Sequence, residues 1–88
     1  MPTYSVNYDL RTPSDHYDPL SDEIKKCAGW WHFLQSTWLV ATAETADELA
    51  DRLLRVIGAT DYLLVIAVGR KFQGNLPPIA WKWIDRYT

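Results

Sequence analysis

Few side chains in this sequence could carry out nucleophilic, acid–base or metal chemistry, and they are scattered along the chain. The candidates are an aspartate, Asp9, two histidines, His16 and His32, and the only cysteine, Cys27. No third partner completes a nucleophilic triad, and Cys27 has the spacing of a core residue at the end of an amphipathic segment. The sequence also lacks the paired Cys or His spacings of structural zinc sites. Nucleophilic catalysis is therefore not expected.

Asp9 is the residue on which metal chemistry would depend. It lies near the end of an alternating stretch, Thr3 to Leu10, that has the period of a half-buried strand. A strand-end carboxylate can bind Mg²⁺, which keeps several waters and needs only one or two carboxylates from the protein. One Asp is not enough, so a shared metal requires a symmetric dimer that brings two copies of Asp9 together. The alternative is a solvated strand end or a turn cap that accepts N–H groups from the following loop.

The remaining candidates are two imidazoles and three cations. His16, in the loop after the first strand, is a candidate general acid toward a leaving oxygen, and the alternative is a solvated loop histidine. His32 lies within an aromatic stretch and is expected to be packed and hydrogen-bonded rather than a ligand. Arg11, Arg70 and Lys71 are the candidate contacts to nucleic-acid phosphates.

Composition favours one small folded domain over residues 1–88, with a core at about 3–68 and a tail at about 70–88. The chain is 48% hydrophobic and 14% aromatic, which is apolar enough to offset the entropy of ordering. So small a domain hides a limited share of its surface and gains from a partner or a second copy. The net charge of −2 argues against a protein whose whole surface binds nucleic acid.

The apolar runs are also too short for a membrane protein. None approaches the ~20 residues that a bilayer span requires, and the N-terminus lacks the pattern of a signal peptide. The single cysteine excludes an intrachain disulfide and suits a reducing compartment. We therefore expect a cytoplasmic protein with no membrane partner.

Periodicity and capping signals define the elements that must position these residues. Thr45 followed by Glu48 forms a capping box, and Gly58 is expected to end the helix that begins there. After Pro77-Pro78, a last helix would carry Ala80, Trp83, Ile84 and Tyr87 on one side. The alternation of Ile79, Trp81 and Trp83 also fits a strand. The expected elements are a strand at 3–10, a helix at 19–28, a hairpin at 30–43 folded near 35–36, a helix at 45–57 and a strand at 61–68.

This order predicts an α+β domain of the ferredoxin-like split β-α-β type (βαββαβ) with a short C-terminal helical tail. In that arrangement the first and third strands are central and the last strand lies at an edge. The last strand is apolar at odd and even positions, and an exposed edge of this kind needs a cover. We expect the tryptophan-rich tail and a second subunit to provide it.

Short motifs along the chain carry a resemblance to a known family. These motifs follow one another in the order of that family. They are the strand ending in Tyr8-Asp9-Leu10, the loop with Arg11, the helix closed near Gly29, the Gln35-Ser36-Thr37-Trp38 stretch, the capped helix and the final apolar strand. Over roughly residues 3–68 the chain resembles the CRISPR-associated protein two family and its ribonuclease relative, virulence-associated protein D. The stretches WWHFLQSTWLV and LPPIAWKWI also look like small bacterial relatives of this family that have no assigned activity.

The resemblance implies a nucleic-acid-associated homodimer in which Asp9 of both subunits lies near the two-fold axis and shares a divalent metal, Mg²⁺. Active members of the family are metal-dependent nucleases, so the implied activity is a weak endonuclease that hydrolyses phosphodiester bonds in RNA or DNA. Other members are non-catalytic scaffolds. The alternative function is therefore a module that binds another protein and catalyses nothing.

Overall fold

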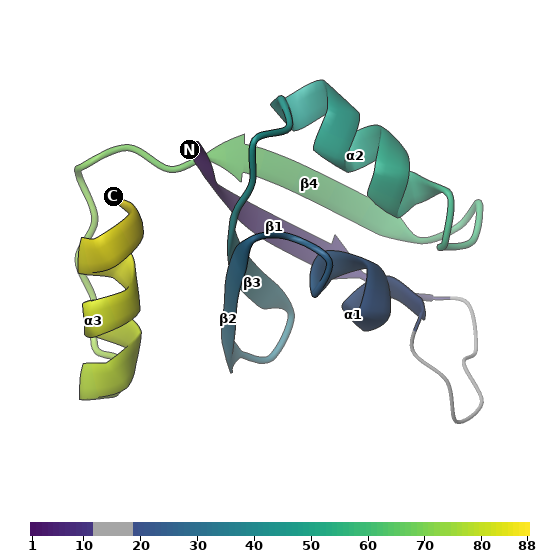
Figure 1. The fold of residues 1–88 in the computed structure, drawn as a ribbon. Coiled ribbons are helices and arrows are strands. Elements are labelled where there is room, and N and C mark those ends of the chain that lie inside the picture. The colour runs from purple at the N-terminus through teal and green to yellow at the C-terminus, as the bar shows by residue number, and fades with distance from the viewer. Residues whose placement is uncertain (12–18) are drawn as a thin grey trace.

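Four strands and three helices make up the described parts of the chain, residues 1–11 and 19–88, in a computed structural model (Figure 1). The α+β class expected from the sequence is confirmed. Among the described residues, no helix is long and apolar enough to cross a membrane. The elements are β1 (Thr3–Asp9), α1 (Pro19–Ile24), β2 (Gly29–Leu34), β3 (Thr37–Ala41), α2 (Ala46–Leu54), β4 (Tyr62–Ala67) and α3 (Pro78–Tyr87).

The strands form one sheet in the order β2-β3-β1-β4, and every neighbouring pair is antiparallel. On β1, Val6 is paired with Trp38 of β3 on one side and with Val65 of β4 on the other. The first and third strands are therefore central and the last strand lies at an edge, as the sequence predicts. The hairpin between β2 and β3 also turns at residues 35–36 as predicted.

The main core lies between one face of the sheet and helices α1 and α2, which lie together in Figure 1 apart from α3. The alternation of β1 turns Tyr4 and Val6 into this core, where both are buried. Trp38 is only 2% exposed, and its indole N–H donates to the hydroxyl of Tyr8 over 3.1 Å. The helices contribute Leu20, Ile24, Leu49 and Leu53.

Both early helices end sooner than the sequence predicts. Helix α2 stops at Leu54, because Gly58 belongs to a loop in which its N–H donates to Asp61 Oδ2 over 2.7 Å. Helix α1 stops at Ile24, and the N–H of Cys27 then donates to the carbonyl of Ile24 in a tighter turn. This turn buries Cys27 in the core.

The tail forms a helix, α3, and packs on the opposite face of the sheet against β2. A second, smaller core joins the buried residues Trp31, Ala80 and Ile84. The expectation that this tail covers the last strand is wrong. Leu64 and Ile66 of β4 remain 56% and 50% exposed, because the larger apolar surface of Trp31 and its neighbours holds α3 at the other edge.

A close approach between Gly29 and Tyr87 fixes the end of α3 on β2. A Cβ atom at Gly29 would lie 2.8 Å from Cζ of Tyr87, whereas a Cβ at Gly69 meets nothing within 4 Å. We expect Gly29→Ala to push the tyrosine ring aside and loosen α3, seen as faster amide hydrogen exchange along that helix. Gly69→Ala is the matched control, and equal exchange rates in the two variants would contradict this packing.

The capping box at the start of α2 is confirmed. The Oγ1 atom of Thr45 accepts from the N–H of Glu48 over 3.2 Å, and Oε1 of Glu48 accepts from the N–H of Thr45 over 2.9 Å. Thr45→Ala leaves the Glu48 N–H without this acceptor and should lower the free energy of unfolding by about 1 kcal/mol. Urea denaturation measures this loss, with Thr60→Ala, at an exposed turn position, as the control. Equal losses in both variants would argue against the cap.

Candidate functional site

Asp9 ends β1, as the sequence predicts, and lies opposite Tyr62 at the start of β4. Its Oδ2 accepts a hydrogen bond from Nη2 of Arg11 over 3.2 Å. The two side chains are 62% and 60% exposed, so this ion pair adds little to stability. The carboxylate is therefore accessible to a ligand but already has a cation beside it.

Asp61, a residue that the sequence analysis did not single out, holds this end of the sheet together. Its Oδ1 accepts from the backbone N–H of Arg11 over 2.5 Å, while its Oδ2 binds the N–H of Gly58. The guanidinium of Arg11 in turn lies 5.1 Å from the ring centroid of Tyr62. The carboxylate that caps the chain after β1 is thus Asp61, and the Asp9 side chain stays at the surface.

The described residues of one chain do not supply a magnesium site by themselves. Across residues 1–11 and 19–88, no group of three or more His, Cys, Asp or Glu side chains could hold a metal ion. A lone carboxylate next to a guanidinium, as at Asp9, is a poor fit for Mg²⁺. The expected metal site therefore rests on a second copy that contributes its own Asp9. His16, the predicted general acid, lies outside the described residues, and its role stays a prediction.

The three predicted phosphate contacts lie at two ends of the same strand. Arg11 lies beside Tyr62 at the start of β4, whereas Arg70 and Lys71 follow the far end of β4. All three cations are exposed. The fold of one chain does not gather them into a single patch.

His32 is packed and hydrogen-bonded as predicted. Its ring stacks on Trp38 with centroids 4.0 Å apart and an interplanar angle of 13°. Its Nε2 lies 3.0 Å from the carbonyl oxygen of Gln35 in the hairpin turn. These contacts account for the position of the His32 ring without a bound ligand.

The face of the sheet turned away from α1 and α2 is partly uncovered. Residues directly opposite each other on antiparallel strands point to the same side, and here Asp9 is paired with Tyr62 and Asn7 with Leu64. The side chains of Tyr62, Leu64 and Ile66 are all at least half exposed. We call this surface the open β4 face. It consists of Asn7, Asp9, Tyr62, Leu64 and Ile66.

A partly buried ionic cluster centred on Arg52 is the most elaborate polar structure in the described residues. Arg52 of α2 donates to both carboxylate oxygens of Glu44, over 2.9 and 2.8 Å. It also donates to the carbonyl and to Oε1 of Glu23 on α1, over 2.6 and 3.1 Å, and to Sγ of Cys27 over 3.3 Å. The cluster therefore ties α1 to α2 and to the loop before it.

These contacts shift the pKa values of the groups involved. The pKa of Glu44 is lowered mainly by its hydrogen bonds from Arg52, and the pKa of Glu23 by those from Lys26 and then Arg52. Burial raises the pKa of the Cys27 thiol, which keeps it protonated and unreactive. The sequence analysis missed this cluster, because Glu23, Glu44 and Arg52 lie far apart along the chain.

Comparison with known proteins assigns no family. No family model matches the chain, and searches of curated proteins and of solved structures return no significant match.

The Arg52 cluster makes stability depend on pH in a defined direction. A carboxyl group whose pKa is lowered on folding stabilises the fold above its unfolded pKa, and this contribution is lost as the pH falls through the folded pKa. For Glu23 and Glu44 the loss lies below their ordinary value of 4.5. Arg52→Met should cost about 1.5–3 kcal/mol at pH 7, because it removes the charged hydrogen bonds to Glu44 and Glu23 and leaves Glu23 with Lys26 alone.

Urea unfolding at pH 7 and at pH 3 checks both effects. The difference in stability between the wild type and Arg52→Met should shrink at pH 3, because the carboxyl groups of the unfolded chain take up protons below about 4.5 and the advantage of their lowered pKa in the fold begins to be lost. Arg55→Met, an exposed cation on the turn that follows α2, is the control. If the difference in stability between the wild type and Arg52→Met is the same at both pH values, Arg52 acts through packing alone.

Proposed function

We propose that the protein is a cytoplasmic, nucleic-acid-associated homodimer with a ferredoxin-like fold, similar to the CRISPR-associated protein two family. Two features support this fold assignment. The elements before α3 follow the order strand, helix, strand, strand, helix, strand, and the sheet has the strand order β2-β3-β1-β4. The free, buried thiol of Cys27 agrees with a reducing compartment.

One observation carries the proposal: Asp9 lies on the same sheet face as an uncovered apolar strip. Tyr62, Leu64 and Ile66 are 62%, 56% and 50% exposed, and apolar strips of this kind on a small protein are typical of interaction surfaces. Sheets that pack face to face lie about 10 Å apart. Two copies that bury this strip against each other would bring their Asp9 residues close to a common axis.

In such a dimer the two Asp9 carboxylates would hold Mg²⁺, with Arg11 of each chain beside them. Two like charges held close need a cation to stay ionised together, so metal and dimer depend on each other. When bound, Mg²⁺ supplies Lewis-acid stabilisation of a phosphoryl oxygen and activates water. The Arg11 side chains would contact the phosphates of the RNA or DNA strand, and Arg70 and Lys71 would extend that contact.

A non-catalytic interaction module is the second candidate function. It is favoured by the ion pair between Asp9 and Arg11, which satisfies the carboxylate without a metal. In this case the open β4 face binds a second copy or another protein, and the paired charges orient the contact. The two candidates share the interface and differ in chemistry.

The dimer can be tested apart from any activity. Leu64→Glu places a charge in the centre of the open β4 face and should convert the dimer into a monomer in sedimentation equilibrium at micromolar concentration. Leu54→Glu is the matched control, because Leu54 is 49% exposed on α2, away from this face. A wild-type protein that sediments as a folded monomer would remove the basis of the proposal.

The chemistry is tested with Mg²⁺ and labelled RNA or duplex DNA. Asp9→Ala should abolish cleavage without lowering the melting temperature, since the Asp9 side chain is 62% exposed. Asp51→Ala, at an exposed position on α2, should cleave like the wild type. Cleavage that survives in Asp9→Ala would come from a contaminant, and a dimer that never cleaves would favour the non-catalytic candidate.

A further inference from the structure

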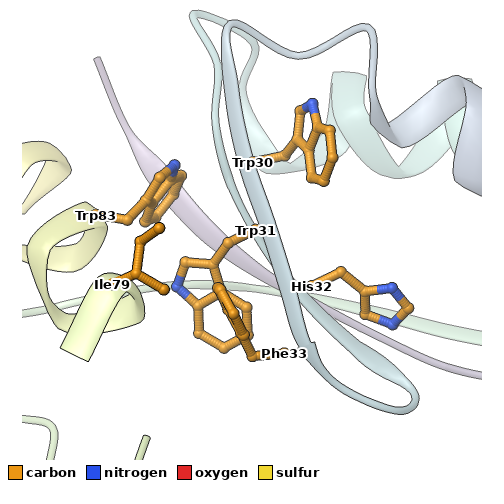
Figure 2. Close-up of a pocket in the computed structure, with 6 residues that line it drawn as sticks. All are labelled: Trp30, Trp31, His32, Phe33, Ile79 and Trp83. Atoms are coloured by element: carbon orange, nitrogen blue, oxygen red, sulfur yellow. The ribbon is translucent and has the colours of Figure 1, made fainter. Parts of the chain in front are cut away.

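A cavity of about 280 Å³ lies along the edge of the sheet opposite the open β4 face, between β2 and α3. It is lined by Trp30, Trp31, His32, Phe33, Ile79 and Trp83, and we call it the β2–α3 groove. Figure 2 shows Trp30 and His32 on one side of the strand and Trp31 and Phe33 on the other. Successive residues of a strand point to opposite faces of the sheet. Four consecutive residues can therefore line one cavity only if the cavity runs along the edge of the strand.

The backbone of β2 at this edge is unpaired within the described chain. β2 is the outermost strand, and its ladder runs only to β3. Alternate residues of such a strand turn their N–H and C=O groups outward, where they can pair with another extended segment. The groove therefore offers main-chain hydrogen bonds beside an apolar wall.

An unsatisfied donor lies in the same place. Trp31 is only 4% exposed, and its indole Nε1 is buried with no hydrogen-bond partner in the described structure. In Figure 2 this nitrogen lies on the side of the ring that faces Ile79. A buried N–H without an acceptor costs free energy, and an acceptor brought in beside Ile79 would recover it.

The rim of the groove carries positive charge. Nζ of Lys25 lies 5.3 Å from the ring centroid of Trp30. On α3, Lys82 and Arg86 each follow a lining residue by three positions, which places them on the same side of the helix as Ile79 and Trp83. The nearby carboxylate, Asp85, follows Trp81 by four positions and therefore lies on the side of the helix that carries Trp81. Trp81 lines a different cavity.

We propose that the β2–α3 groove binds an extended acidic peptide segment, which adds to β2 as a further strand. The peptide main chain pairs with the free edge of β2, and a large apolar side chain fills the space between Phe33 and Ile79. Carboxylates on the peptide face the cations at the rim, and a peptide oxygen accepts from Trp31. A single nucleic-acid strand would use the aromatic rings and cations but not the backbone edge, which favours the peptide.

This inference is independent of the proposed dimer, because the two surfaces lie at opposite edges of the sheet. A suitable probe is the blocked heptapeptide with the sequence EVEFEVE, titrated into ¹⁵N-labelled full-length protein. We expect shifts of the backbone amides at residues 30–33 and of the Trp31 indole N–H. We also expect slower hydrogen exchange along β2.

Matched peptides and variants separate strand addition from other modes of binding. Replacing Glu by Lys in the peptide, or methylating alternate peptide nitrogens, should weaken binding at least about tenfold. Ile79→Glu should do the same without unfolding the protein, because Ile79 is 65% exposed. Leu64→Glu, which tests the dimer, should bind the peptide like the wild type.

Three results would overturn the proposal. The first is the absence of shifts at residues 30–33 at millimolar peptide. The second is equal binding of the acidic and the basic peptide. The third is tighter binding of a nine-nucleotide oligothymidylate at the same residues, which would assign the groove to single-stranded nucleic acid.

Discussion

The edge strands β2 and β4 carry apolar side chains on both faces of the sheet and therefore need cover on both sides. One short chain provides this cover on one face and on half of the other. Helices α1 and α2 bury the first face around Val6 and Trp38. On the second face α3 reaches Trp31 but leaves Leu64 and Ile66 about half exposed. Burying apolar surface is worth about 25 cal/mol per Å², and this burial is the driving force on which the proposed association through the remaining strip would depend.

The position of α3 decides which surface stays uncovered. Ala80 and Ile84 pack under Trp31, and the carbonyl of Tyr87 at the other end accepts from Oγ1 of Thr3 over 2.8 Å. The helix is thereby fixed to β2 and to the first residue of β1. Ile79 and Trp83 of the same helix, together with β2, line the β2–α3 groove.

Elements defined by local patterns could be predicted from the sequence, and those that depend on distant contacts could not. Alternation placed Asp9 at a strand end, and the box of Thr45 and Glu48 placed the start of α2. The end of α2 was not predicted correctly, because Gly58 lies in a loop and does not cap the helix. The Arg52 cluster joins three segments separated in sequence, so no local spacing could reveal it.

The two uncovered regions differ in kind, and this difference limits what each can bind. The open β4 face presents side chains, with Leu64 and Ile66 flat on the sheet and the charged pair of Asp9 and Arg11 at one end. A flat apolar strip with a charge at its end suits another flat surface, of which a second copy is the simplest. The edge of β2 instead presents backbone inside a groove walled by Trp83. The two surfaces lie at opposite edges of the sheet, so a peptide in the groove and a second copy on the open β4 face would not compete for the same residues.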